Sequence, residues 1–154
     1  MLEVVSVSER DRRANERLEL ATTMARANKC TEAEEAFRSA RWMHGANKEF
    51  RLAHRWTMGR KLAECWAHQG TTKGVDRARG WDATSPTLRR TSSKLANPLC
   101  EEGNTAFDLE DWEAAWSALD RCVRLDPTRA WARRDAEVAR RRMLDRALVP
   151  EPRK

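Results

Sequence analysis

The sequence predicts an all-α protein of about five to seven helices. Of its 154 residues, 35% are charged and 40% are hydrophobic, while glycine (6) and proline (5) are scarce and tyrosine is absent. Alanine, arginine, glutamate and leucine, which favour helices, are frequent, and tyrosine, a typical strand residue, is missing. Apolar residues recur every three or four positions, which is the period of an α-helix. The length fits one domain with a modest core.

Three helices are predicted within residues 1–70, and they span about 8–27, 31–45 and 47–68. Ser8 suits the N-cap position of the first helix, and Thr31 and Glu34 have the spacing of a capping box at the second. Gly70 is a stop signal after the third. The expected buried faces consist of Ala14, Leu18, Ala21 and Ala25; of Ala33, Phe37, Ala40 and Met43; and of Leu52, Trp56, Leu62 and Trp66.

The second half of the chain begins with a change of composition. Residues 71–95 are rich in threonine, serine, glycine and arginine, so they predict a basic irregular loop with at most one short helix after Pro86. Asn97 and Pro98 suit an N-cap followed by the first helical position. Further helices are expected at about 97–109, 112–124 and 128–147, before a tail with Pro150 and Pro152. Thr128 would cap the last helix, whose buried stripe would be Ala132, Ala136, Ala139, Met143 and Ala147.

The segment LCEEGNTAFDLEDWEAAWSALDRCVRLDP, within residues 96–129, resembles a tetratricopeptide repeat, which is a hairpin of two antiparallel helices. The family has a small residue where the two helices cross, and Gly103 stands at that position. The second helix has a small, a large and a small residue and a terminal proline, here Ala115, Leu119, Cys122 and Pro127. Glu102 and Ala106 depart from the family pattern, which usually has an apolar and an aromatic residue there.

The same pattern matches residues 14–47 less completely. The matching positions are Leu20, Ala21, Met24, Ala33, Phe37 and Ala40, while Arg17 and Gly45 break the pattern. Repeats of this kind need neighbours that bury their apolar faces. The resemblance therefore implies a short solenoid of helical hairpins, with a degenerate middle repeat that begins at residues 47–68. Residues 130–154 would form the capping helix and a tail.

The resemblance also implies a protein-binding surface. In this family, residues on the inner side of each hairpin's first helix usually contact a partner peptide or helix. By register these residues are Asn15, Leu18, Thr22 and Arg26, then Asn104, Phe107 and Asp108, then Trp131, Arg134 and Arg141. Phe107 and Trp131 would be apolar anchors, and the two arginines would be charged anchors. Cys100 stands where members that bind chaperone tails have a lysine, so we do not expect that ligand.

Catalysis has little support in the sequence. It contains no GxSxG or HExxH motif and no phosphate-binding or dinucleotide-binding fingerprint. Cys65 and His68 share a helix face and could join His44 and His54 around a metal ion, but the paired spacing of structural zinc sites is missing. We therefore expect a non-catalytic adaptor or assembly subunit that needs no cofactor and no metal.

The net charge of +6 is unevenly distributed along the chain. The net charges are +3 for residues 1–70, +4 for 71–98, −6 for 99–126 and +5 for 127–154. An acidic block between basic blocks is unlike the continuous basic stripe of nucleic-acid-binding proteins. It indicates helices of opposite sign that pack together or bridge a partner. The alternative function is an RNA- or ribonucleoprotein-associated protein that binds phosphates through the basic loop and the C-terminal arginines.

The cysteines and the first residues predict the compartment. Cys30, Cys65, Cys100 and Cys122 form no CxxC pair, so we expect reduced thiols and a cytoplasmic location. The N-terminal segment lacks the pattern of a signal peptide or mitochondrial presequence, and no uncharged stretch is long enough to span a membrane. Residues 89–92, Arg-Arg-Thr-Ser, resemble a kinase site at Ser92, provided that the segment is an exposed loop.

Overall fold

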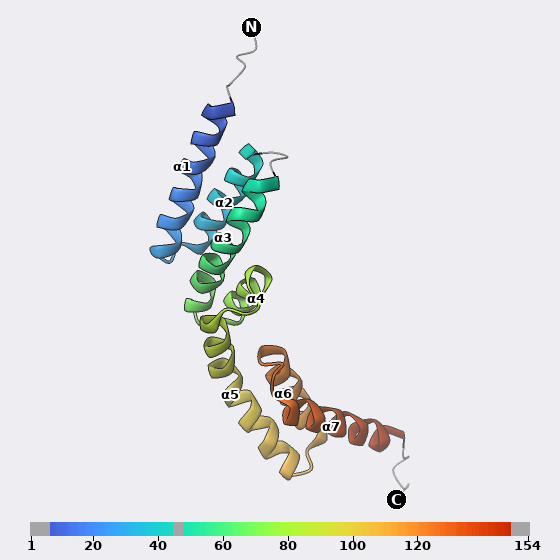
Figure 1. The fold of residues 1–154 in the computed structure, drawn as a ribbon. Helices are drawn as coiled ribbons and strands as arrows, with labels where there is room; N and C mark the ends of the chain where they lie inside the picture. Colours follow the sequence, from blue (N-terminus) through green and yellow to red (C-terminus); the bar gives the residue numbers. More distant parts are fainter. Residues whose placement is uncertain (1–6, 45–47, 149–154) are drawn as a thin grey trace, which may run out of the picture. The chain divides into compact units, whose positions relative to one another are not determined.

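Seven α-helices make up the described part of the protein, which confirms the all-α class (Figure 1). The structure, a computed structural model, describes residues 7–44 and 48–148, with side chains for residues 9–43 and 54–148. These residues contain no strand. The helices are α1 (Val7–Arg26), α2 (Cys30–His44), α3 (Lys48–His68), α4 (Thr72–Trp81), α5 (Pro86–Asp108), α6 (Trp112–Leu125) and α7 (Ala130–Leu148). They belong to two compact units, Met1–Leu88 and Arg89–Lys154, and each unit is described by itself.

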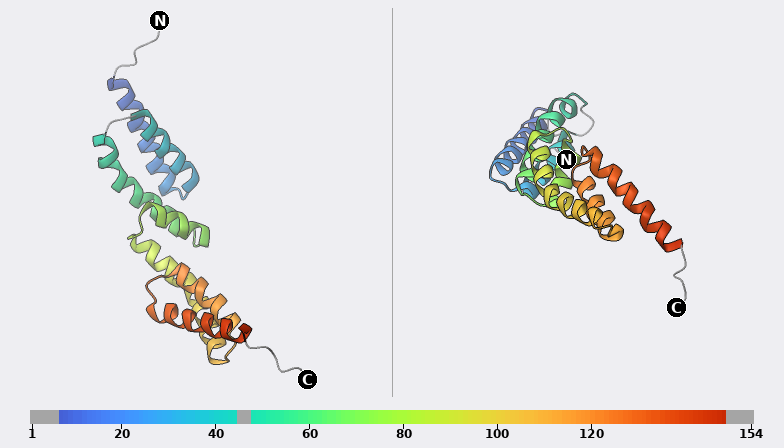
Figure 2. Two further views of the ribbon diagram at one scale, coloured as in Figure 1. Left: turned by 90° about the vertical axis from the view of Figure 1, so that its right-hand side faces the viewer. Right: turned by 90° about the horizontal axis from the view of Figure 1, so that it is seen from below.

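In the N-terminal unit, α1 and α2 pack side by side (Figures 1 and 2). α1 begins at Val7, so Ser8 lies within the helix. The prediction that Ser8 is the N-cap is therefore wrong. Asn28 has a left-handed backbone (φ 58°) in the turn between the helices, which asparagine tolerates well. The expected contact residues Ala14, Leu18, Ala21, Ala25, Ala33, Phe37 and Ala40 are all buried. The helical pairing predicted for residues 14–47 is thus confirmed as far as residue 44.

The predicted buried face of residues 47–68 is only partly correct. Leu62 and Trp66 are buried, but Trp56 is 69% exposed, so its predicted place in the core is wrong. Other predicted features lie outside the described residues or side chains: His44, Gly45, Leu52, Pro150 and Pro152.

Residues 71–95 are largely helical, so the predicted irregular loop is wrong. Gly70 follows α3 with a φ of 65°, and the Thr71 hydroxyl caps α4 by accepting a hydrogen bond from the Gly74 backbone N–H (2.9 Å). α4 packs against α3, and a Cβ on Gly74 would lie only 2.4 Å from the Trp66 carbonyl oxygen. The buried residues of α4 are Gly74, Val75 and Ala78. Such small side chains produce little apolar periodicity, which explains why the sequence did not reveal this helix.

Glu34 joins three helices of the N-terminal unit and does not form the predicted capping box. This residue of α2 is only 4% exposed. Its Oε1 accepts hydrogen bonds from Trp66 Nε1 of α3 (2.7 Å) and Trp81 Nε1 of α4 (2.6 Å), and its Oε2 accepts one from Arg77 Nη1 (3.3 Å). α2 begins at Cys30, one residue before the predicted cap. The carboxylate turns inward because enclosed indole N–H groups need acceptors.

α5 begins at Pro86 and not at the predicted cap, Asn97. The Ser85 hydroxyl accepts a hydrogen bond from the Leu88 backbone N–H (3.4 Å) at this end of the helix. Pro98 therefore lies inside α5, where its ring removes one backbone hydrogen bond. Residues on both sides of the proline are buried, namely Leu88, Ser92, Ala96 and Cys100. This burial explains why the helix continues through a proline that by itself favours a helix start.

The hairpin of α5 and α6 has the close crossing that the sequence predicts. A Cβ on Gly103 would lie 2.6 Å from Leu119 Cγ and 3.0 Å from the Leu119 backbone nitrogen. Three predicted contact residues are fully buried: Ala115, Leu119 and Cys122. Asp111 caps α6 by accepting a hydrogen bond from the Ala114 N–H (3.3 Å). The small residue at position 103 therefore lets the two helices approach each other.

α7 packs on α6 through most of the predicted alanine stripe. Ala132, Ala136 and Ala139 are buried. Met143 is half-buried and Ala147 is exposed. The helix begins at Ala130, two residues after the predicted cap Thr128, whose hydroxyl donates a hydrogen bond to Asp126 Oδ1 (2.6 Å).

Replacement of Gly103 with alanine is expected to lower the free energy of unfolding by about 1–2 kcal/mol, because overpacking outweighs the gain in helix propensity. The Leu119 backbone nitrogen cannot rotate away from the new Cβ. Gly80→Ala is the matched control, since nothing lies within 4 Å of a Cβ there, and it should raise stability by about 0.5–1 kcal/mol. Urea unfolding followed by circular dichroism measures both changes. Equal stability of the two variants would contradict the close crossing.

Candidate protein-binding surface

Two disulfides cross-link the helices, so the prediction of reduced thiols is wrong. Cys30 bonds to Cys65 and joins α2 to α3, and Cys100 bonds to Cys122 and joins α5 to α6. All four residues are at most 3% exposed. The partners are 35 and 22 residues apart in sequence, so no short cysteine motif marks the pairs. The predicted cytoplasmic location loses this support, because disulfides persist mainly in oxidising compartments.

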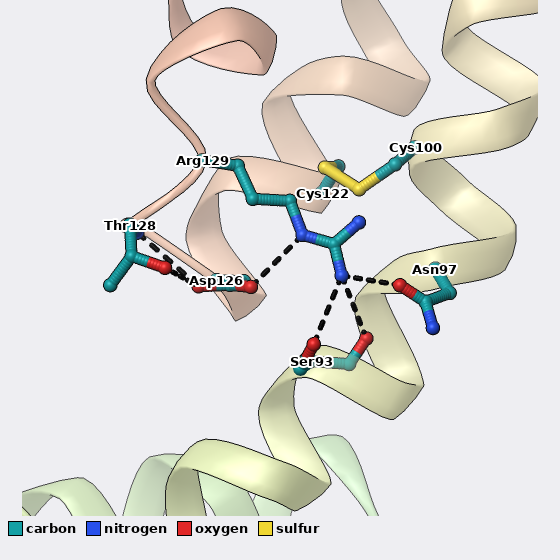
Figure 3. The surroundings of a disulfide bond; sticks show 7 residues. All are labelled: Ser93, Asn97, Cys100, Cys122, Asp126, Thr128 and Arg129. Atoms are coloured by element: carbon teal, nitrogen blue, oxygen red, sulfur yellow. Dashed lines mark hydrogen bonds and ion pairs between the residues drawn. A yellow bond between two sulfur atoms is a disulfide. The ribbon is translucent and has the colours of Figure 1, made fainter.

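Arg129 immediately precedes α7 and lies beside the second disulfide. Its side chain connects this end of α7 to α5 (Figure 3). Its Nε donates a hydrogen bond to Asp126 Oδ2 (2.9 Å), and its Nη2 donates to the Ser93 carbonyl and hydroxyl oxygens (both 3.1 Å) and to Asn97 Oδ1. Asn97 therefore accepts a hydrogen bond from this arginine in the middle of α5. Together with the disulfide, these contacts fix the exposed surfaces of α5 and α7 on one scaffold.

The same contacts control the ionisation of Asp126. Burial by itself would raise the pKa of this carboxyl group. The hydrogen bonds from Thr128 and Arg129, together with the positive charge of the arginine, outweigh burial and hold the pKa below its usual value. Asp126 is therefore a carboxylate at neutral pH, and it stabilises the turn between α6 and α7.

The N-terminal unit has a groove of about 350 Å³ between the C-terminal parts of α1 and α3. Its lining residues are Thr22, Ala25, Arg26, Asn28, Lys61, Glu64, Cys65 and His68. The residues that α3 contributes lie at positions 61, 64, 65 and 68, which share one face of the helix. The disulfide between Cys30 and Cys65 holds this wall of the groove against α2.

The groove carries more positive than negative charge. Arg26 and Lys61 form no ion pair with any described residue. Glu64 has a neighbour in the groove, since its Oε1 lies 3.6 Å from His68 Nε2. An anionic group of a ligand would therefore meet two cations that pair with no described acid, and charge-assisted hydrogen bonds of this kind are among the stronger polar contacts.

The structure brings two of the four binding residues predicted on α1 to this groove. Thr22 and Arg26 line it, whereas Asn15 is exposed but is not among the lining residues. Leu18 is buried in the core, so its predicted binding role is wrong. Sequence reasoning missed the polar residues from α3, which are Lys61, Glu64 and His68. Their spacing of three and four positions was the available signal, but the same helix also carries the apolar stripe on which the prediction relied.

The other predicted binding residues lie on two helices of the C-terminal unit. Asn104 and Asp108 are exposed on α5. Phe107 packs edge-on against Trp112, with ring centroids 5.3 Å apart, so its ring is engaged inside the unit. Trp131, Arg134 and Arg141 are exposed on α7. The unit therefore presents acidic and basic helical surfaces, whereas Phe107 contributes mainly to internal packing.

Other predicted sites change because residues 71–95 are helical. Ser92 is 5% exposed inside α5, so the exposed loop expected at the kinase-like motif does not exist. Arg77, a basic residue of the same stretch, contacts the buried carboxylate of Glu34. The sulfur of Cys65 is part of a disulfide and so is not a free metal ligand.

Two exposed regions are thus defined, the α1–α3 groove in the N-terminal unit and the surfaces of α5 and α7 in the C-terminal unit. Among the helices that the structure describes, none combines the length and the apolar composition needed to cross a bilayer. Comparison with known proteins finds no matching family model, no matching curated protein and no matching solved structure.

Proposed function

We propose that this chain is a non-catalytic adaptor or assembly subunit that binds a partner peptide or helix through tetratricopeptide-like helical hairpins. The order of the helix contacts supports the proposal, since α1 packs on α2, α3 packs on α4, and a disulfide joins α5 to α6. α7 then serves as the capping helix. Within the N-terminal unit, α1 and α3 are then the first helices of neighbouring hairpins, and their inner sides bind the partner.

The α1–α3 groove carries this proposal. It places Arg26 and Lys61, which form no ion pair with any described residue, beside the small apolar residue Ala25. The hydroxyl of Thr22 adds a polar contact, and Cys65 holds one wall in place through its disulfide. A short segment with a carboxylate side chain and a small apolar neighbour fits this combination of charge and size.

Selection of peptides from a random display library on the full, oxidised chain tests the proposal. We expect recovered peptides to share an acidic residue. Reversal of both groove cations, Arg26→Glu with Lys61→Glu, should weaken binding of these peptides at least tenfold, which is about 1.4 kcal/mol. Fluorescence anisotropy with a labelled peptide measures the dissociation constant.

A matched control reverses two exposed arginines that do not line the groove. Arg17→Glu with Arg55→Glu changes one residue on α1 and one on α3, and it alters the net charge by the same amount. This control should bind the peptides nearly as well as the original chain. Equal loss of binding in both variants would show that net charge matters and the groove does not.

The alternative, an RNA- or ribonucleoprotein-associated protein, is tested by one further probe. A generic single-stranded RNA is titrated against the chain at several salt concentrations. Strong binding that falls steeply as salt rises, together with no recovered peptide, would favour the alternative. Failure to bind this RNA at low salt would remove it.

A further inference from the structure

The side of α7 that faces away from α6 carries a regular stripe of apolar and basic residues. Trp131, Arg134, Val138 and Arg141, here called the α7 stripe, follow each other at intervals of three, four and three positions and so share one face of the helix. The tryptophan and the valine are both 37% exposed, and the side chains of the two arginines are more than 70% exposed. The buried alanines of α7 lie on the opposite side. Within the described part of the C-terminal unit, this stripe is therefore an unpartnered helix face.

A complementary stripe lies at the C-terminal end of α5. Glu101, Glu102 and Asp108, with Leu109 directly after the helix, are exposed and are here called the α5 stripe. Glu101 and Asp108 are seven positions apart, which is about two helical turns, and the other two residues of the stripe have the same spacing. The four residues therefore lie on one broad face. The opposite face holds the buried Gly103 and Cys100. The three acids of the α5 stripe thus complement the two arginines of the α7 stripe in charge. Its exposed leucine offers an apolar contact to the tryptophan and the valine of the α7 stripe.

The two stripes are not neutralised by each other within one chain. The three acids of the α5 stripe form no ion pair with any described residue. Among the described acids, the arginines of the α7 stripe contact only those of their own helix, since Arg134 lies 4.0 Å from Asp135 and Arg141 lies 3.4 Å from Glu137. Exposed pairs of this kind contribute little and break easily when a better partner arrives.

We propose that the α7 stripe of one copy docks on the α5 stripe of a second copy of this chain. Each copy carries both stripes, so a twofold dimer can form the contact twice, with the same residues on both sides. Tryptophan and arginine are the residues that most often dominate interface energies, and complementary charge sets the register. The opposite net charges of residues 99–126 and 127–154 would then attract the two copies to each other. This surface is separate from the groove, and the inference does not depend on the proposed function.

Sedimentation equilibrium of the full, oxidised chain tests the inference. We expect a dimer at low salt whose dissociation constant rises with ionic strength. Reversal of the α7 stripe by Arg134→Glu with Arg141→Glu should weaken dimerisation at least tenfold, and so should reversal of the α5 stripe by Glu101→Arg with Asp108→Arg. An equimolar mixture of these two variants should restore the dimer, because both contacts then again join opposite charges.

A control variant, Arg121→Glu with Arg140→Glu, makes the same change of net charge as the reversal of the α7 stripe, but outside both stripes. Arg121 is exposed on α6, and Arg140 lies on α7 away from the α7 stripe. This variant should dimerise like the original chain, and circular dichroism should show that all variants keep their helices. A monomer at every concentration and salt would overturn the inference. So would a mixture of the two stripe variants that stays monomeric.

Discussion

Removal of the disulfide between Cys30 and Cys65 by the double replacement Cys30→Ala with Cys65→Ala is expected to lower the free energy of unfolding by about 3–4 kcal/mol. The bond links positions 35 residues apart, and its loss gives the unfolded chain the entropy of an open loop of that length. It also frees α3 from α2 beside the groove. Denaturant unfolding of the oxidised original chain and of the variant gives the difference, and the groove peptides should bind the variant more weakly.

The second disulfide offers a matched comparison. Cys100→Ala with Cys122→Ala opens a loop of 22 residues in the C-terminal unit, for which the same reasoning gives about 3 kcal/mol. This variant should leave peptide binding in the groove unchanged. Peptide mapping by mass spectrometry without reductant should find the pairs Cys30–Cys65 and Cys100–Cys122. Four free thiols, or a different pairing, would contradict the structure.

Glu34→Ala is expected to lower the free energy of unfolding by about 2–4 kcal/mol. The change removes the acceptor that Trp66 Nε1 and Trp81 Nε1 share, at 2.7 and 2.6 Å, and it also removes the contact with Arg77. Each enclosed donor left without a partner costs about 1–3 kcal/mol. Denaturant unfolding measures the loss, and a change in tryptophan fluorescence should accompany it because both indoles change their surroundings.

Two further variants separate the role of this carboxylate from a general effect of charge. Glu34→Gln keeps one oxygen acceptor and should cost less than Glu34→Ala. Glu35→Ala removes the same charge from the exposed neighbouring position and should change stability by less than about 0.5 kcal/mol. Similar losses for Glu34→Ala and Glu35→Ala would mean that the hydrogen bonds to the indoles do not stabilise the fold.

Helices with strong apolar periodicity could be predicted from the sequence. α6 was expected at 112–124 and is found at Trp112–Leu125, with its buried residues in the expected places. The crossing at Gly103 was expected from the resemblance to a tetratricopeptide repeat, and the structure shows that only a very small side chain there leaves room for Leu119. The buried face of α6 depends on residues close together in sequence, where spacing determines which side chains share a helix face.

Features that depend on distant contacts could not be predicted in this way. α4 buries a glycine, a valine and an alanine, so its packing on α3 leaves almost no apolar pattern. Pro98 marks a helix start in local terms, but burial on both sides of it keeps α5 continuous. Glu34 has the spacing of a capping box, yet its partners are 32 and 47 residues away. Tertiary contacts override local preference at each of these positions.

The candidate site also combines residues that could be predicted from the sequence with residues that depend on distant contacts. Thr22 and Arg26 were predicted from the register that the tetratricopeptide resemblance implies for the first hairpin, and both line the groove. Lys61 and His68 join them only because α3 is held beside α1, and the sequence does not fix that placement. Leu18 has the same register as Thr22 but lies deeper, so it belongs to the core.

The most direct test of the proposed binding function is nuclear magnetic resonance of the isotopically labelled, oxidised chain during titration with the strongest selected peptide. The groove predicts that the largest amide shift changes occur in residues 22–28 and 61–68, which contain its lining residues. The same titration of the Arg26→Glu with Lys61→Glu variant should give much smaller changes. Shift changes confined to other residues, or a library that yields no binding peptide, would contradict the proposal that this groove holds a partner.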